Sequence, residues 1–201
     1  MKKFTFLLIS LLFVFSTKGQ EKFETYHSKY LKKDFRIDIS KSKKDEISFW
    51  INANSMDKSS KNISLKVEKN NLDNFITLIK KSKEKFTEWS KVAKENNVEK
   101  LNKTIEFKSN KYTVAFTYGE WHFDFNVKLQ SRFMVLKDKN VIIIENKNKV
   151  VASDNKYIDS SGFVIVFESE KEIDSFVSKI NLEKAKEKLN SKKKKQDLFK
   201  Q

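Results

Sequence analysis

The sequence predicts an α+β fold: one curved antiparallel sheet, a meander of about 8–10 strands, with two amphipathic helices packed on one face. Two observations predict it. Two long segments carry apolar residues at three- and four-residue steps, which is the period of a helix with one buried side. Most other segments alternate apolar with polar residues, as strands with one face in a core do.

The first 19 residues have the pattern of a signal peptide. Lys2 and Lys3 precede an apolar run from Phe4 to Phe15, and a short polar stretch ends at Gly19. The run is shorter than the roughly 20 apolar residues of a membrane-spanning helix. We therefore expect cleavage after Gly19 and an exported protein, periplasmic or secreted, with no transmembrane segment after signal cleavage; a retained membrane-anchoring terminus is the alternative. The folded domain then covers residues 20–190, followed by a Lys-rich tail, 191–201.

Seven segments alternate as strands before, between and after the helices. They are Phe35–Ile39, Ile47–Ala53, Ile63–Val67, Ile105–Phe107, Tyr112–Tyr118, Trp121–Val135 and Phe163–Phe167. Val141–Ile144 is instead a continuous apolar run, so we expect this strand to be covered on both faces.

The first helix is predicted over about residues 70–96. Asn70 or Asn71 can cap it, and Asp73 lies in its first turn, where a negative charge is favourable. Its apolar stripe consists of Leu72, Phe75, Ile76, Ile79, Phe86, Trp89 and Ala93.

The second helix is predicted to begin after Ser169. Ser169 and Glu172 form an S-x-x-E capping box, in which each side chain accepts a hydrogen bond from the other residue's backbone N–H. The stripe Ile173, Phe176, Val177, Ile180 and Ala185 then runs without a break into the Lys-rich tail.

One hairpin can be placed in register from the sequence. Gly119 and Glu120 suit a two-residue type II′ turn. This turn places four apolar pairs on the core face: Tyr118 opposite Trp121, Phe116 opposite Phe123, Val114 opposite Phe125, and Tyr112 opposite Val127. The other face, with His122 and Asp124, is expected to be polar and exposed to water.

The chain also resembles itself. Residues 63–67 match 163–167 at an offset of 100, and the two helical stripes match at an offset of 101. Two pseudo-repeats, 30–97 and 103–190, each of several strands followed by a helix, would explain this. The alternative is that any strand followed by a helix gives this pattern.

Composition excludes several chemistries. There is no Cys and no Pro, and Gly occurs three times, which excludes disulfides, Cys-ligated metals and Gly-rich phosphate loops. The only histidines are His27 and His122; His122 and Asp124 share one side of a strand, but the spacing suggests no third metal ligand. There is no G-x-S-x-G nucleophile motif. We expect no cofactor, no metal and no enzymatic activity.

The net charge is +15, and the three lysines of the leader reduce it to 15 − 3 = +12 after cleavage. Arg occurs only at positions 36 and 132, so nucleic acid is an unlikely partner, because base and phosphate recognition favours the planar guanidinium. The densest basic run is Lys192, Lys193, Lys194 and Lys195. It is either a polyanion-binding tail or the solvated C-terminus of a helix.

Trp50 is placed by alternation on the face opposite the core. It is either an exposed contact residue or is buried beneath segment 26–31, and we favour burial.

The leading functional hypothesis is a non-catalytic binding or interaction module of the cell envelope or extracellular space, whose partner is a protein or an envelope component. The candidate contact residues are Trp50, His122, Asp124 and Lys192–Lys195. One alternative is a carrier that holds an apolar small molecule between sheet and helices. Another is a polyanion binder that acts through the Lys-rich C-terminus.

Overall fold

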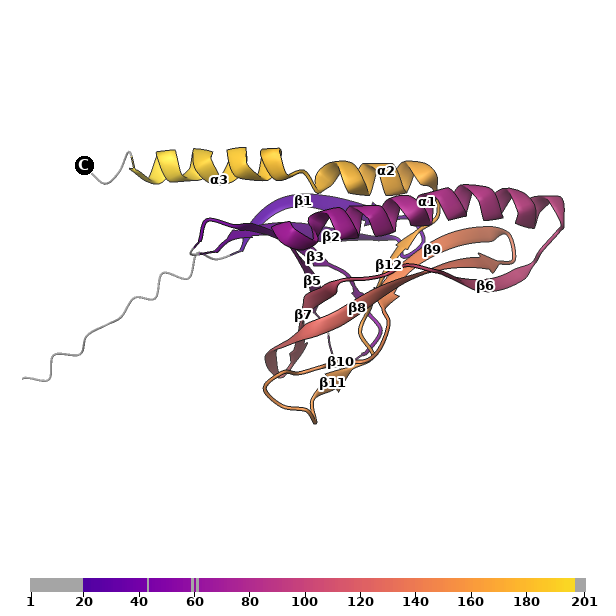
Figure 1. The fold of residues 1–201 in the computed structure, drawn as a ribbon, viewed down its shortest axis with the longest axis horizontal. Coiled ribbons are helices and arrows are strands. Elements are labelled where there is room, and N and C mark those ends of the chain that lie inside the picture. Colours follow the sequence, from indigo (N-terminus) through magenta and orange to yellow (C-terminus); the bar gives the residue numbers. More distant parts are fainter. Residues whose placement is uncertain (1–19, 43, 59, 61, 198–201) are drawn as a thin grey trace, which may run out of the picture.

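The computed structural model describes residues 20–197 except 43, 59 and 61, with side chains as far as Ser191. The predicted signal peptide lies outside these residues. Within them, ten strands form one antiparallel sheet, and the helices lie along one side of it (Figure 1). The α+β prediction, with a curved antiparallel meander, is confirmed.

The strands are β1 (Glu21–Ser28), β2 (Lys33–Lys41), β3 (Ile47–Asn52), β4 (Asn54–Ser55), β5 (Ile63–Glu68), β6 (Lys100–Ile105), β7 (Lys111–Tyr118), β8 (Glu120–Leu136), β9 (Lys139–Asn146), β10 (Val150–Val151), β11 (Asp159–Ser160) and β12 (Phe163–Phe167). The helices are the short 3-10 turn η1 (Lys69–Asn71), α1 (Leu72–Glu95), α2 (Glu170–Lys179) and α3 (Leu182–Asp197).

The strand order contains two four-stranded meanders side by side. β1, β2, β3 and β5 lead into α1, and β7, β8, β9 and β12 lead into α2, with β5 paired to β7 between them. Each helix packs mainly on strands of the other meander: α1 contacts β8 and β9, and α2 contacts β1. The two halves therefore share one core. The sequence duplication itself stays a prediction, although this arrangement is the one it predicts.

Aromatic rings fill the space between the helices and the sheet. Phe176 on α2 is fully buried, and its ring centroid lies 4.9 Å from that of Tyr26, 5.1 Å from that of Phe167 and 6.3 Å from that of Phe75 on α1. Edge-to-face pairs at such distances add to the energy of burial. This cluster joins β1, β12 and both helices in one packed unit.

The run from Val141 to Ile144 is buried on both faces of the sheet, as predicted. Ile142 and Ile144 belong to the main core, whereas Val141 and Ile143 form a smaller cluster on the opposite face with Val166.

The first helix begins close to the predicted residue, but its cap differs. Asn71 occupies the N-cap position without a side-chain capping bond. Its amide instead donates to the carbonyl oxygen of Lys111 at 2.8 Å. The side chain therefore ties the start of α1 to the start of β7. Asp73 lies in the first turn, as predicted.

The second helix has the predicted Ser169 cap but only half of the predicted capping box, and the helix breaks. The Ser169 hydroxyl accepts a hydrogen bond from the N–H of Glu172 at 3.2 Å. The Glu172 carboxylate does not return to the N–H of Ser169; it accepts from the N–H groups of Glu168 and Lys29, both at 2.9 Å. The expected single helix ends at Lys179, where Ile180 leaves the helical region (φ −92°, ψ 67°).

A second cap explains the break. The side chain of Asn181 accepts a hydrogen bond from the N–H of Lys184 at 3.0 Å, which starts α3 afresh. With this break, Ile180 and Ala185 are both buried, and α3 continues from α2 along the same side of the sheet, where it contacts β3 (Figure 1).

Strand β1 was not predicted from the sequence. Two aromatic side chains of Glu21–Ser28, Phe23 and Tyr26, pack against the core, but they are three residues apart and a bulge lies between Lys22 and Glu24, so the strand shows no period-two alternation. Pairing with β2 along the whole strand places it in the sheet.

Candidate functional site

The β7–β8 hairpin has a register one residue away from the predicted one. Gly119, at a φ of +71°, is the only residue between Tyr118 and Glu120, which face each other. Phe116 therefore pairs with His122 rather than with Phe123. The predicted pairing of residues 121–125 is wrong.

A β-bulge then restores the predicted register further along. Thr113 stands opposite two residues, Phe125 and Asn126, and beyond them Tyr112 faces Val127 as expected. The extra residue inverts the alternation of β8. Val127 points into the core, whereas the apolar residues before the bulge point out.

The result is a stripe of three aromatic side chains on the outer face of the sheet. Trp121, Phe123 and Phe125 have exposed fractions of 50%, 38% and 57%. The rings of Phe123 and Phe125 are parallel within 3°, with centroids 6.3 Å apart. These residues were expected in the core, and their uninterrupted alternation with polar residues gives no sign of a surface position.

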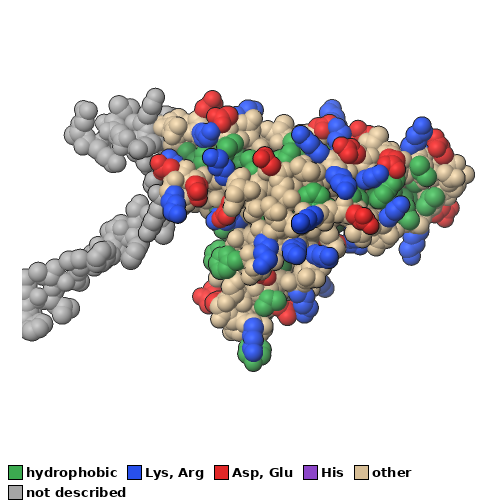
Figure 2. Space-filling view, in the orientation of Figure 1, with side chains coloured by type: hydrophobic (Ala, Val, Ile, Leu, Met, Phe, Trp, Pro, Cys, Tyr) green, Lys and Arg blue, Asp and Glu red, His purple; other side chains and the backbone are tan. Residues whose placement is uncertain are grey.

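The stripe lies at an end of the sheet where other hydrophobic side chains are also exposed, Tyr118 among them on the opposite face of the hairpin. Of the eight large hydrophobic side chains exposed in the described part of the chain, six lie on neighbouring segments at one end of the sheet. We call this region the aromatic lobe, and its six residues are Met56, Tyr118, Trp121, Phe123, Phe125 and Tyr157. The β7–β8 hairpin and the β10–β11 ribbon project here, away from the helices (Figure 1), and hydrophobic side chains reach the surface of this end (Figure 2).

Asp124 holds the lobe together. Its carboxylate accepts hydrogen bonds from the N–H of Asn126, at 2.8 Å, and from that of Val151, at 2.9 Å. The N–H of Ser153 donates to the carbonyl oxygen of Phe123 at 2.8 Å. The first half of β8 and the segment after β9 are thus joined, and Asp124 has a positioning role in the lobe.

His122 is buried rather than exposed to water, so the expected wet face is corrected here. Its side chain is 3% exposed and packs against Phe116, with ring centroids 5.8 Å apart. Its Nδ1 lies 3.4 Å from the carboxylate of Asp154. Within the described residues, no group of three or more His, Cys, Asp or Glu side chains could hold a metal ion.

A second carboxylate supports the lobe from the other side. Asp57 accepts hydrogen bonds from the hydroxyl of Ser160, at 2.5 Å, and from the N–H of Ser161, at 2.6 Å. Burial alone would raise the pKa of Asp57, but these hydrogen bonds and the Lys149 ammonium together lower the pKa below its usual value. The carboxylate is therefore held in its charged form.

Trp50 lies on the outer face of the sheet and is 8% exposed, so the favoured burial is observed. Its indole N–H donates to the hydroxyl of Ser40 at 2.9 Å, and the ammonium of Lys66 lies 5.6 Å from the ring centroid. These contacts come from β2 and β5, the strands on either side of β3. Segment 26–31, which was expected to cover Trp50, instead includes the end of β1.

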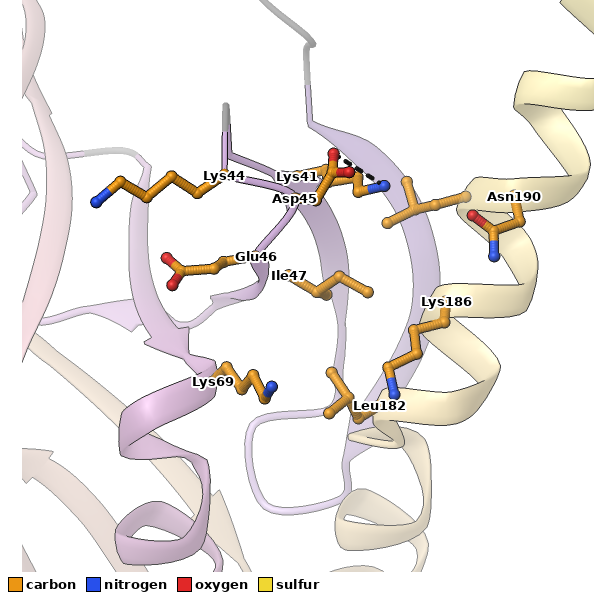
Figure 3. Close-up of a pocket in the computed structure, with 10 residues that line it drawn as sticks. Lys41, Lys44, Asp45, Glu46, Ile47, Lys69, Leu182, Lys186 and Asn190 are labelled. Atoms are coloured by element: carbon orange, nitrogen blue, oxygen red, sulfur yellow. Dashed lines mark ion pairs between the residues drawn. The ribbon is translucent and has the colours of Figure 1, made fainter.

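A basic groove separates α3 from the β2–β3 turn. It has a volume of about 480 Å³, and Figure 3 shows side chains from both elements pointing into it. The apolar side chains of Ile47, Leu182 and Leu189 line it together with Lys41, Lys44, Lys69, Lys186, Asp45, Glu46 and Asn190. Lys41 and Asp45 form an ion pair of 3.1 Å across the turn. Four ammonium groups thus stand against two carboxylates.

The predicted tail residues Lys192–Lys195 lie in the last turns of α3, beyond the side chains that the structure describes. Their role stays a prediction. None of the described helices has the length and apolar character needed to cross a membrane.

Two buried tyrosines have raised pKa values. Desolvation raises the pKa of Tyr26 and of Tyr112, and their hydroxyls donate to the carbonyl oxygen of Asn52 and to the side-chain oxygen of Asn74, both at 2.9 Å. Both belong to the core, so their pKa shifts have a structural cause.

The aromatic lobe and the basic groove are the two surface features of the described residues on which a functional proposal is based below. The sequence indicates neither of them: the lobe depends on a bulge and the groove on a helix break. No protein-family model matches this chain, and neither a curated protein nor a solved structure matches it.

Proposed function

We propose that this protein is a non-catalytic binding module of the cell envelope or extracellular space, and that the aromatic lobe is its contact surface. One observation carries the proposal: six of the eight exposed large hydrophobic side chains in the described part of the chain gather on this lobe. The stripe Trp121, Phe123 and Phe125 is the part of the lobe that shares one face of one strand. Exposed apolar patches of this kind mark interaction sites, and aromatic side chains are enriched among the residues that dominate binding energy.

The lobe is built as a rigid platform. The hydrogen bonds of Asp124 and Asp57 fix both loops that flank the stripe. Little conformational entropy is then lost when the lobe binds, which favours affinity. The export expected from the leader supports a partner outside the cytoplasm.

A second candidate function is polyanion binding, favoured by the basic groove. Four lysine side chains line it, and Lys192–Lys195 follow on the same helix. The carrier alternative has less support, because fully buried rings, among them Phe75, Phe116 and Phe176, occupy the space between the helices and the sheet.

Sedimentation with envelope fragments tests the leading proposal. Mature protein, residues 20–201, is mixed with washed envelope fragments from a bacterial host, and the bound fraction is measured after centrifugation. Replacing Trp121, Phe123 and Phe125 together with Thr, a good strand former, should lower the affinity at least tenfold. The variant keeps its fold because the three rings lie outside the core, and circular dichroism checks this.

The matched control replaces the two exposed large hydrophobic residues outside the lobe, Tyr30→Ser with Val92→Ala. This variant should bind as the wild type does. Equal binding by the wild type and the triple Thr variant would show that the lobe is not the contact surface. Loss of binding on deletion of residues 191–201 alone, in low salt, would favour the polyanion candidate instead.

A further inference from the structure

We infer that the aromatic lobe is an anchor for a lipid surface, and that its occupant is the headgroup layer of a bilayer that contains anionic lipids. This inference rests on the proposed function and names the partner of the same surface. Lobe residues are of the types that settle at this layer, where Trp and Tyr rings lie with their polar group in water and their apolar body in lipid.

Shape is the first argument. The lobe projects from the sheet on the side away from the helices (Figure 1), so it can enter a flat surface without a clash from the body. Tyr157, in the segment between β10 and β11, is the most exposed large hydrophobic residue described, at 84%. Interfacial anchors insert their apolar side by about 5–10 Å, a depth that a projecting hairpin and loop can reach.

The distribution of charge is the second argument. The aspartates of the lobe are engaged within it: Asp57 by residues 160 and 161, Asp124 by Asn126 and Val151, Asp154 by His122, and Asp159 by Lys149 at 3.2 Å. Three acidic side chains of the lobe are exposed: Glu120 in the turn, Asp154 at 67% and Asp159 at 43%. Cationic side chains surround the rings, and the ammonium of Lys156 lies 5.2 Å from the ring centroid of Tyr157.

The basic residues around the lobe include Lys58, Lys111, Lys128 and Lys156, all exposed. Aromatic rings flanked by ammonium groups complement a surface that is apolar below and negative above. The formal net charge of +12 expected after cleavage of the leader attracts the whole molecule to such a surface. A protein partner would instead need apolar pockets matched to rings on a convex face.

Vesicle binding tests this inference. Mature protein is titrated with vesicles of phosphatidylcholine containing 30% phosphatidylglycerol and, separately, with vesicles of phosphatidylcholine alone. We expect binding to the anionic vesicles and weaker binding to the neutral ones. The triple Thr variant should bind the anionic vesicles with about 100-fold lower affinity, because it loses three rings that are each about half exposed and would be buried in the lipid. The Tyr30→Ser, Val92→Ala variant should bind as the wild type does.

Trp121 also reports insertion directly. It is the exposed member of the three tryptophans, since Trp50 is 8% exposed and Trp89 packs against the core. Lipids brominated on the acyl chain should quench part of the fluorescence of the bound protein. Trp121→Phe removes this reporter, so whatever fraction of the variant binds should show little quenching, because Trp50 and Trp89 lie outside the lobe.

Three results would overturn the inference. If the triple Thr variant binds anionic vesicles as tightly as the wild type, lysines elsewhere bind the lipid. If bound wild type is not quenched, the lobe does not insert. If envelope fragments bind in a lobe-dependent way but pure vesicles do not, the partner is another envelope component or a protein, and the proposed function stands without this partner.

Discussion

Replacing Arg132 with Met tests how the outer face of the sheet is stabilised. Arg132 on β8 holds the carboxylate of Glu145 on β9 through two hydrogen bonds, from Nε at 2.6 Å and from Nη2 at 2.7 Å. Glu145 is 5% exposed, and its other partner is the side-chain amide of Gln130, at 2.6 Å. Without the guanidinium, a nearly buried negative charge keeps a single neutral donor.

The expected loss in the free energy of unfolding is about 3 kcal/mol. Breaking a buried ion pair by removing one partner typically costs about 3–5 kcal/mol, because the remaining charge stays buried without compensation. The lower end applies here because the side chain of Arg132 is 26% exposed and water can partly replace it. For a chain of this length, about 3 kcal/mol corresponds to a fall in Tm of roughly 6–12 °C.

The assay is urea unfolding at pH 7 of the wild type, Arg132→Met, Glu145→Gln and the double variant. The double variant removes the buried charge, so it should be more stable than Arg132→Met and lie within about 1–2 kcal/mol of the wild type. Lys186→Ala is the control, since its pair with Glu183 is 46% and 73% exposed and should contribute less than about 0.5 kcal/mol. If Arg132→Met is as stable as this control, or the double variant is less stable than Arg132→Met, the reasoning is refuted.

Three further predictions concern the lobe and the helix break. Gly162→Ala should lower the free energy of unfolding in urea by about 3 kcal/mol or more, because φ is +99° and a Cβ would lie 1.9 Å from the side-chain oxygen of Asn146. Gly119→Ala is the control: φ is +71°, no atom lies within 4 Å of the added Cβ, and the loss should be only about 1–2 kcal/mol. Equal losses in the two variants would contradict this reasoning. Asn181→Ala should cost about 1 kcal/mol by removing the cap of α3, and an unchanged midpoint would indicate that α2 and α3 behave as one helix. Asp57→Asn should destabilise the protein at neutral pH. The pKa of Asp57 is lowered in the folded state, so the stability that its carboxylate contributes is present above the unfolded pKa of about 4 and is lost as the pH falls through the folded pKa. The difference in Tm between the wild type and Asp57→Asn should therefore shrink in acid and not grow.

Local patterns were sufficient for most elements of the fold. The stripe of α1 and the Ser169 cap lie where the spacing predicts them, because helix period and capping are properties of a few neighbouring residues. The break after Lys179 was missed. Asn181 is a good cap, but an apolar stripe continued past it, and only packing shows that Ile180 and Ala185 are both buried with a non-helical residue at the junction.

The aromatic lobe could not be predicted in the same way. From Trp121 to Leu129 the apolar residues alternate without interruption, and this pattern favours a single core face. The turn places His122 opposite Phe116, which itself pairs with Ile63 of β5, so the contacts of three strands decide the register. An extra residue opposite Thr113 then inverts the alternation.

The amino-acid sequence alone determined that strands and helices form, where most of them lie, and that they build an antiparallel sheet with helices on one face. Tertiary structure alone decided which side of β8 faces water. The physical reason is that side chains on a strand alternate with a period of two, so a shift of one residue exchanges the faces at no local cost. Pairing with distant strands selects between the two registers, and in this protein it leaves the side chains of Trp121, Phe123 and Phe125 on the solvent-exposed face of the sheet.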